Sequence, residues 1–107
     1  MSLDISLIQV QPTEVFSRNI THNLGKMAKA AGIYMHLWRP DELGLAKAHE
    51  LIQPLEAGLA ELVNNPEKYK AYDAPNGWGT YEHFIPFVRE VLEACKEYPD
   101  ATIEVSR

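Results

Sequence analysis

Apolar residues in this sequence recur at three- and four-residue steps, in blocks that end at prolines. The first block starts after Thr21, whose hydroxyl can cap a helix, and ends at Arg39-Pro40, because the residue before a proline avoids the helical region. The spacing predicts one amphipathic helix over residues 21–38. Its apolar stripe consists of Leu24, Met27, Ala28, Ala31, Tyr34, Met35 and Trp38.

The second block predicts a helix from about residue 41 to 64 that contains a proline. Asp41 is a suitable N-cap, and the apolar residues after it alternate in steps of three and four, which points one seam at a partner helix. These residues are Leu45, Ala48, Ile52, Leu55, Leu59 and Leu62. Pro54 removes one backbone hydrogen bond, so we expect either one kinked helix over 41–64 or two helices broken at residue 53.

Two further helices are expected beyond residue 64. Asn65-Pro66 is typical of an N-cap followed by a proline at the first helical position, which predicts a short helix through Tyr72. Residues 73–79 contain one proline and two glycines, which predicts a loop. Thr80 is placed to cap the last long helix, whose buried stripe we expect to be Phe84, Phe87, Val88, Val91, Leu92 and Cys95.

Both ends of the chain have the pattern of β-strands. Residues 4–10 are rich in Ile, Leu and Val, and Pro12 separates them from a loosely alternating run over 13–20, which indicates two short strands or one bent ribbon. Residues 101–107 alternate apolar and polar side chains, as a half-buried strand does. We therefore predict an α+β fold, mostly helical, with three helical blocks packed on one face of a small antiparallel sheet formed by the N- and C-terminal strands.

Length and charge limit the classes of function. A chain of 107 residues, 46% of them hydrophobic, has the size of one domain, so we expect a single domain over residues 1–107. The net charge of -5 and the scattered basic residues make nucleic acid an improbable partner. The N-terminus does not resemble a signal peptide, and no apolar run has membrane-spanning length, so we expect a cytoplasmic protein without membrane contact.

Residues 76–82, with the sequence NGWGTYE, form the first candidate site. We favour the interpretation that Trp78 is a buried anchor and that the flanking glycines let the chain bend around it. The alternative is a ligand platform on which Trp78 or Tyr81 stacks against a flat group. Asn76-Gly77 favours a tight turn. No Lys-Ser or Lys-Thr pair follows the last glycine, so the segment is not a phosphate-binding P-loop.

Polar side chains at two helix boundaries form the second candidate site. Thr21, His22 and Asn23 either cap a helix, or place an anion at its start with help from Arg18. Arg39 either pairs with a nearby carboxylate, that of Asp41 or Glu42, or faces a ligand beside Trp78. The predicted ligand-binding set is Thr21, His22, Asn23, Arg39, Asn76, Trp78 and Tyr81.

The sequence gives little support for catalysis, and we expect no cofactor. Cys95 lies on the expected buried stripe, where a thiol is inert, and none of the four histidines has metal-ligand spacing. One alternative is a small hydrolase or nucleotide-processing enzyme that uses His22 with Glu82 or His83. Another is a structural homo-oligomer whose interface is Trp38 or the strand edges.

Three motifs occur together in this chain: Thr21-His22-Asn23-Leu24, Leu37-Trp38-Arg39-Pro40, and the NGWGTYE segment. With them, the sequence from about residue 18 to 107 resembles small proteins of bacterial, prophage and phage genomes that have no assigned activity. The resemblance implies a mobile-element context and carries over no catalytic residues. Our leading hypothesis is a non-enzymatic binding protein that uses an aromatic and polar patch to bind a host protein or a small nucleotide-like ligand.

Overall fold

The computed structural model describes residues 2–9 and 14–107 of the chain. Within these residues, five α-helices pack on a three-stranded antiparallel sheet, which confirms the predicted α+β fold. The strands are β1 (Ser2–Ile8), β2 (Glu14–Thr21) and β3 (Thr102–Ser106). The α-helices are α1 (Gly25–Ala30), α2 (Tyr34–Trp38), α3 (His49–Asn64), α4 (Pro66–Lys70) and α5 (Tyr81–Glu97), and the 3₁₀ helices are η1 (His22–Leu24) and η2 (Pro40–Leu43).

The strand order is β2-β1-β3, so the N-terminal strand pairs with the C-terminal one as predicted. Leu3, Ile5 and Leu7 of β1 are buried beneath the helices, whereas Asp4 between them is exposed on the other face. This alternation explains why one face of the sheet is covered and the other is polar. The expected strand ends Val10 and Thr13, and Pro12, which we expected to separate the two strands, lie outside the described residues.

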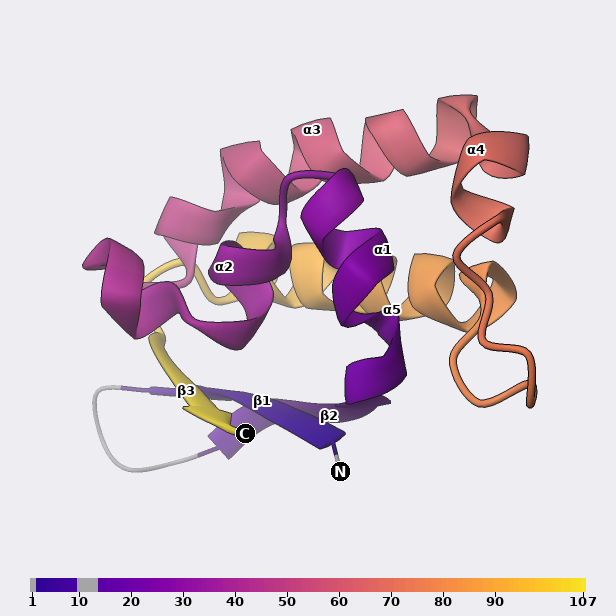
Figure 1. The fold of residues 1–107 in the computed structure, drawn as a ribbon. Coiled ribbons are helices and arrows are strands. Elements are labelled where there is room, and N and C mark those ends of the chain that lie inside the picture. The colour runs from indigo at the N-terminus through magenta and orange to yellow at the C-terminus, as the bar shows by residue number, and fades with distance from the viewer. Residues whose placement is uncertain (1, 10–13) are drawn as a thin grey trace.

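The helices form layers above the sheet (Figure 1). Helix α5 lies between the sheet and α3, and α1 and α2 lie at the same level, below α3 in this view, with α2 in contact with α3. The predicted buried stripe of α5 is confirmed, because all six of its residues are buried: Phe84, Phe87, Val88, Val91, Leu92 and Cys95. None of the described helices combines the length and hydropathy that crossing a bilayer requires.

The prediction of one helix over residues 21–38 is wrong, because Gly32 ends α1 and reverses the chain. Gly32 has φ +81°, its N–H donates to Lys29 O at 3.1 Å, and the N–H of Ile33 donates to Ala28 O at 3.0 Å. These two bonds form a Schellman motif, the usual way in which a glycine terminates a helix. The buried side chain of Ile33 then packs beside Gly58 of α3.

The prediction of a helix beginning at residue 41 is also wrong. Gly44 turns the chain with φ +75°, and the residues after it extend beside the start of β3. The N–H of Ile103 donates to Ala46 O at 2.9 Å, and the N–H of Ala48 donates to Ala101 O at 2.9 Å. Helix α3 therefore starts at His49, and it continues through Pro54, so the alternative of two helices broken at residue 53 is wrong.

Candidate functional site

The loop that contains Trp78 is held in shape by its own hydrogen bonds. The N–H of Trp78 donates to Asn76 Oδ1 at 3.0 Å, and the N–H of Gly77 donates to Ala74 O at 3.0 Å. A third bond runs from the N–H of Ala74 to Gly79 O at 3.1 Å. Asparagine and glycine thus supply the tight turn that the sequence suggested.

The same loop packs against the segment that starts the first helical block. Asn23 Nδ2 donates to Trp78 O at 2.8 Å. Gly79 is buried, and a Cβ on it would lie 3.0 Å from both Asn23 Cβ and Thr21 Cγ2. Glycine at position 79 therefore permits a contact between two segments that are 55 residues apart. The structure thus brings the Trp78 loop against Thr21 and Asn23 of the second candidate site.

Trp78 is 71% exposed, so our interpretation of it as a buried anchor is wrong. Tyr81 is the ring that enters the core: it is 8% exposed, and its hydroxyl donates to Leu62 O at 2.6 Å. Its N–H donates to Asp73 Oδ1 at 2.7 Å, so Asp73 rather than the Thr80 side chain caps α5. Trp78, and not Tyr81, is the ring that faces solvent.

His22 is oriented by Trp38. The indole Nε1–H of Trp38 donates to His22 Nδ1 at 2.8 Å, so the ring proton of neutral His22 is assigned to Nε2. Thr21 caps the segment as expected, because its hydroxyl accepts from the N–H of Asn23 at 3.3 Å. Trp38 itself is 2% exposed.

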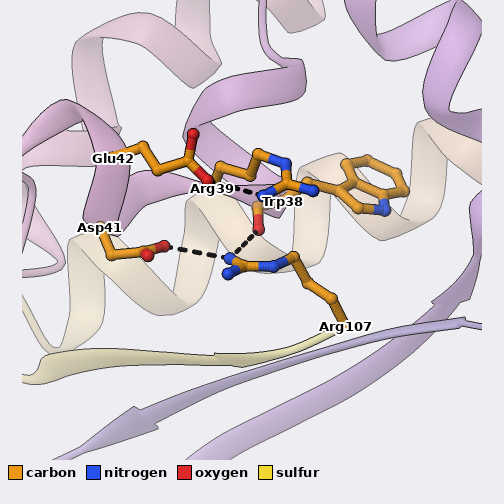
Figure 2. Close-up of polar contacts among 5 residues, drawn as sticks. All are labelled: Trp38, Arg39, Asp41, Glu42 and Arg107. Carbon is orange, nitrogen blue, oxygen red and sulfur yellow. Dashed lines mark hydrogen bonds and ion pairs between the residues drawn. The ribbon is translucent and has the colours of Figure 1, made fainter.

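Two arginines lie next to Trp38, as Figure 2 shows. Arg39 Nη1 pairs with Glu42 Oε2 at 2.6 Å, one of the two partners expected for it, and this contact raises the pKa of Arg39. Arg107 Nη1 donates to Trp38 O at 2.8 Å and to Asp41 Oδ1 at 3.1 Å. The Arg107 guanidinium lowers the pKa of the Asp41 carboxyl. Trp38 therefore fixes His22 through its side chain and Arg107 through its backbone.

These residues line one groove, which we call the basic groove, with a volume of about 290 Å³. Its lining residues are His22, Gly25, Lys26, Lys29, Tyr34, Trp38, Arg39 and Arg107. Gly25 lies beside the Tyr34 ring, where an added Cβ would make an ordinary van der Waals contact of 3.4 Å. Sequence reasoning found His22 and Arg39, but it missed Lys26, Lys29 and Arg107. The three-residue spacing of the two lysines was a visible signal, whereas nothing local pointed to Arg107.

A second hollow, of about 560 Å³, lies on the other side of His22. It is lined by His22, Asn23 and Lys26 together with residues 71–75, which lead into the Trp78 loop. Trp78 is not part of the basic groove lining. Of the predicted set, His22 lines both hollows, Asn23 lines the second and Arg39 lines the basic groove, whereas Trp78 lines neither of them.

The groups suggested for catalysis each have other partners. Glu82 Oε1 pairs with Lys70 Nζ at 3.5 Å, and His83 Nδ1 lies 3.1 Å from the Thr80 hydroxyl oxygen. Burial raises the pKa of the Cys95 thiol to about 12, which suppresses its thiolate. Among residues 2–9 and 14–107, no hydrogen bond joins His22 to Glu82 or His83, and no three potential ligands gather as a metal site.

Comparisons with protein-family models, with curated protein sequences and with solved structures find no match to this chain. The function is therefore inferred from the surface of the protein. Two features stand out on it: a tryptophan held in solvent by a hydrogen-bonded loop, and a groove rich in cationic side chains in an acidic protein.

Proposed function

We propose that this is a non-enzymatic binding protein that contacts another protein through the Trp78 surface. We define this surface as Thr21, His22, Asn23, Asn76 and Trp78. The observation that carries the proposal is the 71% exposure of Trp78 on a loop that hydrogen bonds hold in place. The finer parts of the proposal are that the partner is a host protein and that the two meet in the cytoplasm.

An exposed tryptophan on an ordered loop suits a protein interface. Tryptophan is among the residues most enriched at interface positions that dominate the binding energy, because its ring buries a large area in a pocket of the partner. Four hydrogen bonds fix the backbone around Trp78 before any partner arrives. Pre-ordering of this kind lowers the entropy that binding would otherwise cost.

The position of Trp78 favours a protein partner over a small flat ligand. A small ligand is usually enclosed by a concave site, whereas Trp78 is largely exposed and is not part of the basic groove lining. A partner that supplies its own pocket fits such a projecting ring better. Asn23 and Asn76 bond to the backbone of Trp78, so polar groups adjoin this residue, as they adjoin the apolar centre of many interfaces.

The proposal is tested with immobilised protein and a host-cell lysate. The wild type, Trp78→Ala and Val63→Ala are compared, and bound proteins are quantified by mass spectrometry. Val63 is a matched control because it is an apolar side chain, 46% exposed, on α3. We expect a protein that the wild type and Val63→Ala retain equally and that Trp78→Ala binds at least about tenfold more weakly. If all three proteins retain the same set in the same amounts, the proposal is wrong.

A further inference from the structure

We propose that the basic groove binds a small organic phosphate, that is, a phosphomonoester attached to a compact apolar body. This site adjoins the Trp78 surface and shares His22 with it, but Trp78 itself is not part of the groove lining. The groove would bind a ligand of defined chemistry, while Trp78 would remain available to contact a protein partner.

The first argument is the concentration of positive charge. The chain has a net charge of -5, yet the groove is lined by four of its ten Lys and Arg side chains and by none of its fifteen Asp and Glu side chains. Within the part of the chain that the structure describes, Lys26 and Lys29 form no ion pair. A concave surface lined by one sign of charge focuses its field and attracts the opposite charge.

The second argument is that the cationic groups come from separate parts of the fold. Lys26 and Lys29 lie on α1, Arg39 follows α2, and Arg107 follows β3. A solvated helix face would explain the two lysines alone, because charged residues three apart share one face of a helix. It does not explain why the end of the sheet adds Arg107 to the same groove.

The third argument is that Trp38 holds the donors in position before a ligand binds. Its indole N–H fixes His22, and its carbonyl oxygen accepts from Arg107 at 2.8 Å. With Nδ1 of His22 occupied as an acceptor, the neutral ring offers its Nε2–H as a donor. Binding sites gain affinity when their polar groups need not be ordered by the ligand.

The ion pairs already formed by the arginines leave donors for an anion. Arg39 uses Nη1 for Glu42, and Arg107 uses Nη1 for both of its acceptors. Each guanidinium has five N–H donors in a planar fork, which matches the oxygens of a phosphate. The Arg39–Glu42 pair is also substantially exposed, with side-chain exposures of 40% and 47%, and exposed pairs are weak. A dianionic phosphate can therefore bind beside these carboxylates or displace them.

A neighbouring hollow of about 640 Å³ suggests where the organic part would lie. It shares Lys29, Tyr34 and Arg39 with the basic groove, and its remaining lining includes Met35 and Leu43. The phosphate would face the cationic side, and an apolar or aromatic body would lie against Met35 and Leu43. Pockets that join a mostly apolar wall to a few placed polar groups are the usual form of small-molecule sites.

The test is a titration followed by amide chemical shifts in solution. The probes are adenosine monophosphate, adenosine, inorganic phosphate and a single-stranded oligonucleotide. We expect adenosine monophosphate to bind with a Kd below about 1 mM, inorganic phosphate to bind more weakly, and adenosine to show no saturable binding. Shifts should be largest at Lys26, Lys29 and Arg39, and Trp78→Ala should bind the nucleotide like the wild type.

A matched pair of double variants separates a built site from diffuse charge. Lys26→Gln with Lys29→Gln should weaken adenosine monophosphate at least about tenfold, because it removes both unpaired cations of the groove. Lys68→Gln with Lys96→Gln removes the same charge from α4 and α5 and should leave the affinity within about twofold. The proposal would be overturned if about 10 mM adenosine monophosphate caused no chemical-shift changes. It would also be overturned if both double variants lost the same affinity for the nucleotide. Oligonucleotide binding that is tighter than nucleotide binding would overturn it in favour of a nucleic-acid site.

Discussion

Replacement of Gly79 by alanine tests the contact that joins the Trp78 loop to the start of the first helical block. Gly79 has φ +103°, which L-residues rarely adopt and which costs about 1–3 kcal/mol. A Cβ would also lie 3.0 Å from Thr21 Cγ2 and from Asn23 Cβ, and 3.3 Å from Leu24 Cγ. Overpacking of this kind costs about 1–3 kcal/mol. The combined loss of unfolding free energy is about 2–4 kcal/mol, allowing for partial relaxation.

Gly77→Ala is the matched control, because it changes the same loop without the contact. Gly77 has φ +77°, but an added Cβ would meet nothing within 4 Å. Gly77→Ala therefore loses only the unfolding free energy that a left-handed backbone costs an L-residue, about 1–2 kcal/mol. The difference between the two variants therefore isolates the packing of position 79 against residues 21–24.

Thermal and urea unfolding of both variants measure the difference. At about 4–8 °C per kcal/mol for a domain near this size, Gly79→Ala should lower Tm by roughly 10–25 °C, about twice the effect of Gly77→Ala. If the two variants lose the same stability, or if Gly79→Ala is neutral, the loop does not pack against the helix start as described.

Two further predictions concern the core. Gly58→Ala should lower the unfolding free energy by about 1–2 kcal/mol, because its Cβ would collide with Ile33 Cγ2 and this strain exceeds the helix-propensity gain of about 1 kcal/mol. In a double variant measured by urea unfolding, Ile33→Ala should recover part of the loss caused by Gly58→Ala. Additive losses in the double variant would contradict the collision. The pKa of Cys95 is raised to about 12, so its thiol stays protonated in the folded state, while in the unfolded chain it ionises above its ordinary pKa of 9.0. The unfolding free energy should therefore fall between pH 9 and 12. The fall should be steeper than in Cys95→Ala by up to about 1.4 kcal/mol per pH unit. Parallel pH profiles of the two proteins would contradict that assignment.

The elements that could be predicted from the sequence are those that local spacing determines. The stripe of α5 repeats over several turns, so its period identifies a helix and its buried face. The alternation at residues 101–107 likewise identifies β3, whose apolar positions 101, 103 and 105 are less exposed than the polar positions between them. Pro66 begins α4 for the local reason that its fixed backbone angle suits the first turn of a helix.

The elements that could not be predicted depend on partners distant in the chain. Leu45 and Ala48 continue the helical spacing of α3, yet residues 46–48 bond to the start of β3 instead. The apolar spacing continues on both sides of Gly32. The sequence therefore could not show whether this glycine adopts a left-handed conformation, as it does, or continues a helix.

The candidate site shows the same division. The motifs singled out both Asn23 and Trp78, which a hydrogen bond joins, but they did not indicate which of the two rings, Trp78 or Tyr81, faces the core. Two rings three residues apart cannot be ranked for burial by their types alone. Arg107 joined the basic groove only because β3 ends next to Trp38, which no local pattern encodes.

The central claim, that Trp78 is a contact residue for another protein, is tested most directly by crosslinking in host cells. A photoreactive phenylalanine analogue is placed at position 78 and, as a control, at position 63 on α3. We predict an irradiation-dependent adduct with one protein partner from position 78 and none of that mass from position 63. An absence of adducts at position 78, or the same adducts at both positions, would contradict the claim.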